Sequence, residues 1–146
     1  MKNRNLDHKN DWKTPDSVFD FIFDRYGFYK ENLFDPCPFM NDINNWDWLK
    51  DEWNKEKHIF INPPYELKLK EAFVKKWIEF AEKNPKRFVI MLLPVSTSTK
   101  LFHDYILPNK KEIHFLKWRV KFSWRNTKWE WVNNKCWMHD SMIVVF

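Results

Sequence analysis

Two apolar runs on either side of an amphipathic segment constrain the fold of this chain more than any other feature. The runs are HIFI at residues 58–61 and RFVIMLLP at residues 87–94. A nearly continuous apolar run is typical of a parallel strand that is covered on both faces. Residues 67–83, between the runs, have the apolar spacing of a helix. Its apolar side consists of Leu69, Phe73, Trp77 and Phe80. Strands that alternate with helices predict an α/β layered sheet.

The first part of the chain predicts a helix followed by a short strand. Thr14 fits a helix N-cap, with Pro15 at the first helical position and Gly27 at the end. Residues 33–35 then form a short apolar stretch that Pro36 ends. This order places a helix directly before the first strand of the sheet.

The last third of the chain predicts one more helix and several strands. The segment STSTKLFHDYI fits a helix capped by Ser96, and residues 112–118 alternate as a strand does. Residues 120–132 look like the two arms of an antiparallel hairpin around residues 125–128. The apolar residues 141–146 close the chain as a last strand.

Length and composition favour one domain. The chain has 146 residues, of which we expect 1–11 to form a flexible arm and 12–146 a single domain. No apolar stretch is long enough for a bilayer, and the polar N-terminus has no signal-peptide core. Cys37 and Cys136 lack metal-ligand spacing. A reduced cytoplasmic protein without a metal is the simpler prediction, although one disulfide between them stays open.

The tetrapeptide Asn62-Pro63-Pro64-Tyr65 follows the first apolar run directly. Ligands of open α/β sheets bind at the carboxyl ends of strands, so it is a candidate site. The side-chain oxygen of Asn62 and the carbonyl of Pro63 are acceptors, and neither proline has an N–H. Acceptors beside the Tyr65 ring suit a planar group with an NH₂, such as adenine N6, cytosine N4 or an amide. Taken alone, the tetrapeptide fits a rigid loop equally well.

Positive charge gathers toward the C-terminus. Residues 110–146 hold eight Lys or Arg and three Asp or Glu, a net charge of +5. Basic side chains there alternate with aromatic ones. We take five basic residues and one tryptophan as candidate DNA contacts: Lys117, Arg119, Lys121, Trp124, Arg125 and Lys128. In a hairpin, Lys117, Arg119 and Lys121 would share a solvated face, with Trp118 on the buried one. That pattern also suits a plain sheet edge.

Three motifs in order resemble those of the amino-methyltransferases. WKTPDSVFDFI at 12–22 resembles motif X, FDPCP at 34–38 a glycine-poor motif I, and NPPY at 62–65 motif IV. Later segments, including VIMLLPVSTSTKLFHDYI and SMIVVF, resemble the phage-type, Dam-like DNA N6-adenine methyltransferases. The resemblance extends over roughly residues 11 to 146.

The resemblance implies a fold, a cofactor and a site. The fold would be a compact Rossmann-like sheet with a late hairpin, and the donor would be S-adenosyl-L-methionine. Asn62, Pro63, Pro64 and Tyr65 would grip an adenine flipped out of double-stranded DNA. The cofactor would meet these residues: Trp12, Thr14, Pro15, Asp35, Pro36, Cys37 and Asn62. Such a protein can act as a monomer in the cytoplasm of a bacterial or phage-infected cell.

One departure from the family pattern leaves alternatives open. The segment after Asp35 has no glycine, and the acid expected to bind the cofactor ribose is hard to place; Asp42 and Asp47 are candidates. As an alternative enzyme activity, the chain could methylate another amino nitrogen, of cytosine, RNA adenine or a protein glutamine. It could also be an inactive DNA-binding module of the same fold.

Overall fold

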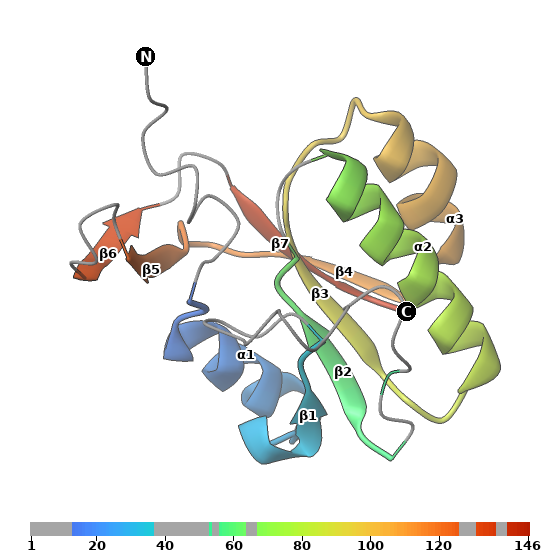
Figure 1. The fold of residues 1–146 in the computed structure, drawn as a ribbon, viewed down its shortest axis with the longest axis horizontal. Coiled ribbons are helices and arrows are strands. Elements are labelled where there is room, and N and C mark those ends of the chain that lie inside the picture. Colours follow the sequence, from blue (N-terminus) through green and yellow to red (C-terminus); the bar gives the residue numbers. More distant parts are fainter. Residues whose placement is uncertain (1–12, 37–52, 54–55, 64–66, 126–130, 137–139) are drawn as a thin grey trace.

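A five-stranded sheet forms the centre of the computed structural model of this chain (Figure 1), which describes residues 13–36, 53, 56–63, 67–125, 131–136 and 140–146. The strand order is β1-β2-β3-β7-β4. The strands are β1 (Leu33–Phe34), β2 (His58–Ile61), β3 (Val89–Pro94), β4 (Glu112–Phe115) and β7 (Ser141–Val145). The α/β class is confirmed, whereas the expected arm at 1–11 lies outside the described residues.

Strand directions bring four strand ends to one edge of the sheet. β1, β2 and β3 are parallel, and β7 runs antiparallel to both β3 and β4. β4 therefore points the same way as β1 to β3. We call the edge where these four strands end the carboxyl edge, and the opposite one the amino edge. Four residues follow the strands at the carboxyl edge: Asp35, Asn62, Val95 and Leu116.

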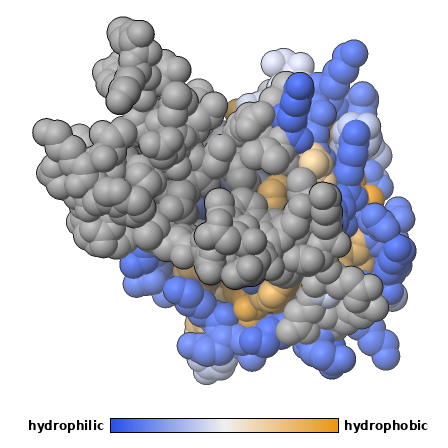
Figure 2. All heavy atoms as spheres, viewed as in Figure 1, coloured by the Kyte–Doolittle hydropathy of each residue, from blue (hydrophilic) through white to orange (hydrophobic). Residues whose placement is uncertain are grey.

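Helices cover both faces of the sheet. α1 (Asp16–Tyr26) lies on one face, and α2 (Leu67–Lys83) lies on the other with the π-helical η3 (Leu101–Ile106) and its short continuation α3 (Leu107–Asn109). A 3₁₀ turn, η2 (Lys30–Asn32), leads into β1. Hydrophilic side chains spread over the outer surface on the α2 side (Figure 2). The expected helix at 67–83 is confirmed.

The alternation of side chains along β3 explains its continuous apolar run. Met91 and Leu93 pack with α2 and η3, through residues such as Trp77, whereas Ile90 and Leu92 pack with α1. All four β3 side chains are buried because each face of the strand meets a helix. The sheet thus separates two cores that the sequence pattern alone does not distinguish.

Two helix starts differ from the sequence prediction. The N-cap of α1 is Pro15, not Thr14, and no side chain caps that helix. The third helix starts at Leu101, and Ser96 does not cap it. Instead, the Thr99 hydroxyl accepts from the Phe102 N–H at 3.2 Å. The Thr14 hydroxyl instead accepts a hydrogen bond from Asn62, far away in the sequence.

The late hairpin is confirmed, but it begins after the first basic residues. β5 (Lys121–Arg125) and β6 (Trp131–Cys136) pair antiparallel in a separate sheet. The predicted strand at 112–118 ends at Phe115, so residues 116–120 form a connection and not a strand arm. Trp118 is accordingly 38% exposed and not on a buried face. The prediction that side chains alternate between a solvated and a buried face is therefore wrong for residues 116–120.

A polar cluster ties the end of α1 to the start of β4. The Tyr26 hydroxyl donates to Glu112 Oε2, and His114 Nε2 lies 2.9 Å from the same oxygen. Arg25 is 3.9 Å from the other carboxylate oxygen. The hydrogen bonds from Tyr26 and His114 lower the pKa of Glu112. Because β4 starts at the amino edge, this cluster fixes the C-terminal end of α1 there.

Within the described residues, no helix is both long and apolar enough to span a membrane.

Candidate functional site

The Asn62-Pro63 pair sits where a fully buried strand reaches the carboxyl edge. Ile59, Phe60 and Ile61 are 0% exposed. Asn62 is half-buried and Pro63 is buried. The apolar strand thus anchors the backbone up to Ile61, and the first polar side chain beyond it emerges at the rim. This arrangement agrees with the position that the sequence predicts for a ligand group.

A hydrogen bond joins Asn62 to the segment before α1. The Asn62 side-chain Nδ2 donates to the Thr14 hydroxyl at 3.1 Å. The two residues are 48 positions apart in sequence. Thr14 does not cap α1, so the bond to Asn62 is the described use of its hydroxyl. The N-terminus of α1 therefore lies at the carboxyl edge, while its Tyr26 end lies at the amino edge.

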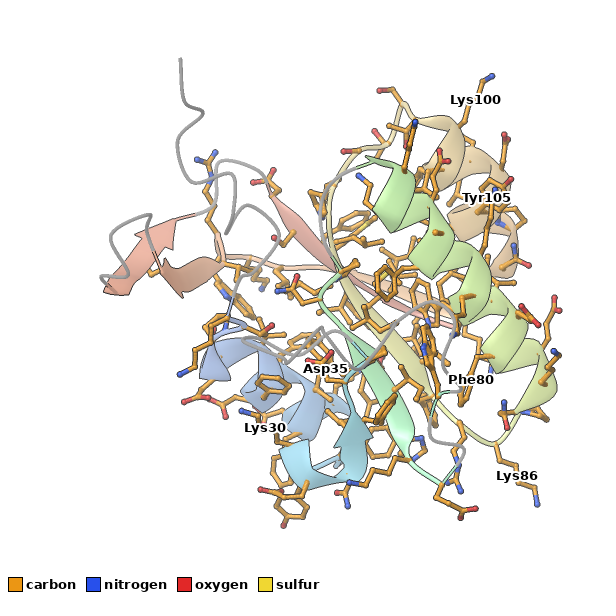
Figure 3. All side chains as sticks on the ribbon, viewed as in Figure 1. Lys30, Asp35, Phe80, Lys86, Lys100 and Tyr105 are labelled. Atoms are coloured by element: carbon orange, nitrogen blue, oxygen red, sulfur yellow. The ribbon has the colours of Figure 1, made fainter. Side chains whose placement is uncertain are left out.

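Asp35 reaches the same edge from the neighbouring strand. In the parallel register Leu33 pairs with His58 and Phe34 with Ile59. Continued by one residue, this register brings Asp35 level with Phe60, two residues before Asn62. Asp35 is half-buried and Pro36 is buried. Figure 3 shows Asp35 near the middle of the molecule, far from Lys86 and Lys100.

Several predicted site residues lie outside the described part of the chain: Trp12, Cys37, Pro64, Tyr65 and Lys128. The candidates for the ribose acid, Asp42 and Asp47, lie there too. Of the predicted cofactor set, the structure brings together Thr14, Pro15 and Asn62, with Asp35 and Pro36 just after the neighbouring strand β1.

Comparison with known protein families decides which family this site belongs to. The profile of one family, described as DNA N-6-adenine-methyltransferase (Dam), matches residues 2–146. The chain belongs to the Dam family. It is also 37% identical over 100 residues to a protein of Escherichia phage T1 named DNA N-6-adenine-methyltransferase. No solved structure matches the chain.

The match to the phage T1 protein is partial. It covers 64% of this chain and 39% of the length of the phage protein. The resemblance found in the sequence motifs is confirmed at the level of the family. The mixed α/β sheet is compatible with a methyltransferase fold.

Basic residues of this Dam-family chain follow β4 onto the carboxyl edge. Lys117, Arg119 and Lys121 are all exposed. Arg119 Nε lies 3.8 Å from an oxygen of Asp140, and both side chains are largely exposed. An ion pair so open to water holds Arg119 only weakly. Three cations thus lie at the same edge as Asn62, although 117–119 are not part of the hairpin.

Trp124 and Arg125 do belong to the hairpin, in β5. Their side chains lie outside the described part of the structure. Their expected contact with DNA therefore stays a prediction.

One candidate residue at this edge was not found from the sequence. Lys70, in the first turn of α2, is half-buried and lines a small hollow with Pro94, Ser96 and Thr99. Burial lowers the pKa of its ammonium group. In the sequence Lys70 is one of several lysines on an amphipathic helix, so no local signal distinguishes it. Its place beside the carboxyl end of β3 makes it a further candidate for contact with an anionic substrate.

Within the described ranges, no three His, Cys, Asp or Glu side chains gather in a way that could hold a metal ion.

Proposed function

We propose that this chain transfers a methyl group from S-adenosyl-L-methionine to N6 of adenine in double-stranded DNA. The observation that carries the proposal is the position of Asn62: it ends a buried strand, and its amide is held by Thr14 at the start of α1. Membership of the Dam family supports the same activity. The sheet would then be a Rossmann-like methyltransferase sheet, to which the hairpin β5–β6 adds a DNA-facing element.

The chemistry of the target group requires hydrogen-bond acceptors. Adenine N6 carries two N–H donors, and it is reached only after the base is flipped from the duplex. The Asn62 Oδ1 and the Pro63 carbonyl would accept these two bonds, and Tyr65 would stack on the ring. Acceptors aimed at N6 stabilise the positive charge that develops on this nitrogen. Most of the rate would come from such positioning, so no strong base is needed.

The residues at the carboxyl edge fit the proposed cofactor. When bound, S-adenosyl-L-methionine supplies a methyl group on a positively charged sulfur. The Asp35 carboxylate suits the ammonium group of its methionine part. The free N–H groups at the start of α1, beside Thr14 and Pro15, suit its carboxylate. We place the protein, as a monomer, in the cytoplasm of a bacterial or phage-infected cell.

The direct test is incubation with labelled S-adenosyl-L-methionine and DNA, followed by mass spectrometry of the nucleosides. We expect N6-methyladenine. N4-methylcytosine, or label in RNA or protein, would redirect the proposal to another amino nitrogen. DNA binding without any methyl transfer or cofactor binding would favour an inactive module of the same fold.

Calorimetry of Asp35→Ala tests the cofactor site. We expect cofactor affinity to fall about tenfold or more, because the carboxylate that would face the ammonium group is lost. A tenfold loss corresponds to about 1.4 kcal/mol of binding free energy. Asp104→Ala removes an exposed carboxylate from η3, on the other side of the sheet, and should bind as the unchanged protein does. Equal binding by both variants would remove Asp35 from the site.

A further inference from the structure

The Asn62 amide has two ends, and only one of them suits the amino group of adenine. Its oxygen accepts hydrogen bonds, and its nitrogen carries two donors. Adenine N6 also carries N–H donors. If the amide turned its nitrogen toward the base, two donors would face each other and no hydrogen bond could form. Rotation of the amide by half a turn exchanges the two ends with little change in shape. A site that uses Asn62 therefore needs something that fixes which end faces the substrate.

In the structure, Thr14 holds the nitrogen end of the Asn62 amide. Its hydroxyl accepts from Asn62 Nδ2 at 3.1 Å, which leaves Oδ1 as the other end of the amide, turned away from Thr14. Thr14 is itself half-buried, and it precedes Pro15, whose ring fixes the backbone as the N-cap of α1. α1 is held against the sheet by Val18 and Ile22, both 0% exposed. The hydroxyl thus belongs to a rigid part of the fold.

We infer that Thr14 is a positioning residue for methyl transfer: it orients the Asn62 amide so that Oδ1 faces the target amino group. This inference rests on the proposed function and assigns the Thr14 hydroxyl a role in catalysis in place of contact with the cofactor. Thr14 touches neither reacting atom in this role and acts only through Asn62.

Single-turnover rates at saturating DNA and cofactor test the inference. Thr14→Val keeps the shape of the side chain but removes the hydroxyl, and Thr14→Ser keeps the hydroxyl. We expect Thr14→Val to lower the rate constant of methyl transfer about tenfold or more, because the acceptor is no longer held in place. Thr14→Ser should restore most of the rate. The dissociation constant of S-adenosylmethionine should stay within about twofold in both variants, a change worth well under about 1 kcal/mol.

A matched control separates positioning from folding. Asn84→Ala removes a half-buried side-chain hydrogen bond away from the site, beyond the end of α2, where Asn84 Nδ2 donates to the Phe80 carbonyl at 3.0 Å. It should lower the melting temperature and leave the rate constant of the folded protein unchanged. If Thr14→Val does not fold, Thr14→Ala serves as the second variant without a hydroxyl. A full rate constant in a folded hydroxyl-free variant overturns the inference, as does a loss that appears only in cofactor affinity.

Nuclear magnetic resonance of the side-chain amide tests the contact without relying on activity. The two Nδ2 protons of Asn62 should give separate resonances, of which the one bonded to Thr14 shifts upfield in Thr14→Val but not in Thr14→Ser. Unchanged resonances in Thr14→Val would overturn the inference even if the protein proves inactive. Inactivity of the unchanged protein with a normal shift would instead count against the proposed function.

Discussion

Among single residues, Asn62 links a structural contact to a proposed catalytic one. Its Nδ2 bonds Thr14, and its Oδ1 is the atom proposed to meet adenine N6. One side chain can serve both because an amide has a donor end and an acceptor end. Substitution at this position should therefore have a small effect on folding and a large one on chemistry.

Asn62→Ala should lower the rate of methyl transfer about a hundredfold or more, since a preorganised polar partner is lost. It should lower the free energy of unfolding by only about 1 kcal/mol, for one half-buried hydrogen bond. Asn84→Ala is the matched control, because Asn84 Nδ2 donates to the Phe80 carbonyl at 3.0 Å beyond the end of α2. The control should lose similar stability and keep its rate. Activity that simply follows the folded fraction in both variants contradicts the catalytic role.

The Tyr65 ring gives a second test of the proposed base pocket. Stacking needs the ring and not the hydroxyl, so Tyr65→Phe should keep most of the activity. Tyr65→Ala should lose on the order of 1–3 kcal/mol of base binding, or roughly tenfold to a hundredfold. Single-turnover rates over a range of DNA concentrations measure both variants. Full activity of Tyr65→Ala would mean that the flipped base is held in another way.

His58 connects stability to pH at the amino edge. The Phe88 N–H donates to His58 Nδ1 at 2.9 Å, so that nitrogen must stay unprotonated. Burial of the ring, followed by the charge of Arg87, lowers the pKa of His58 below its usual 6.5. Unfolded chains therefore take up a proton at this residue before folded ones do. Its contribution to stability is complete above about pH 6.5 and is lost as the pH falls.

Denaturant midpoints measured between about pH 7.5 and about pH 5 test this behaviour. The midpoint of the unchanged protein should fall with pH in this range. His58→Asn offers an acceptor without titrating, so its midpoint should depend less on pH. Asn109→Ala, at an exposed residue that does not titrate, should retain the original profile. Equal slopes in all three proteins would mean that another group governs the pH dependence.

Among the helices and strands, each face of the sheet carries a core that its own helices close. Phe146 follows β7, is 2% exposed, and has its ring centroid 3.7 Å from that of the fully buried Trp77 on α2. Its N–H donates to the Val89 carbonyl at the start of β3. One residue therefore joins α2, β3 and the segment after β7.

Phe146→Ala should lower the free energy of unfolding by about 3–5 kcal/mol, since it opens a cavity among these elements. That is a large share of the roughly 5–15 kcal/mol typical of a domain. Phe115→Ala changes the same side chain at a position that is 61% exposed, and should have an effect within about 0.5 kcal/mol. Urea unfolding measures both. A small effect of Phe146→Ala would show that this part of the core relaxes around the gap.

For the molecule as a whole, the direction of the strands places the exposed cations that flank them at one of two edges. Lys117, Arg119 and Lys121 come after β4, at the carboxyl edge with Asn62. Lys57, Lys86 and Lys111 come just before β2, β3 and β4, at the amino edge, and all are exposed. In Figure 3, Lys86 and Lys100 mark the two opposite ends of the α2 side. The two sets carry the same charge and differ in place.

Substitution of Lys117, Arg119 and Lys121 by Ala should weaken DNA binding and flatten its dependence on salt. Each phosphate that is no longer neutralised should reduce the slope of log affinity against log salt by about one unit. The same change at Lys57, Lys86 and Lys111 removes equal charge from the amino edge and should leave the slope nearly unchanged. Fluorescence anisotropy at several salt concentrations measures both. Equal effects of the two sets would indicate net charge alone and no DNA surface at the carboxyl edge.

The type of most elements, and the residue at the end of β2, could be predicted from the sequence. Apolar periodicity is local, so the pattern of residues 67–83 and the uninterrupted run of β3 were enough to predict a helix and a covered strand. The motif that begins at Asn62 was visible for the same reason, because its four residues are adjacent in the chain.

The way in which distant segments meet depends on tertiary packing. Insertion of β7 between β3 and β4 sets which residues share the carboxyl edge, and no local pattern specifies strand order. The bond between Thr14 and Asn62 spans 48 positions, and it takes the Thr14 hydroxyl away from the cap that its local sequence predicts. The exposure of Trp118 likewise depends on where β4 ends. Local propensity favours a helix cap for the Thr14 hydroxyl, but packing brings the Asn62 amide within hydrogen-bond distance of it.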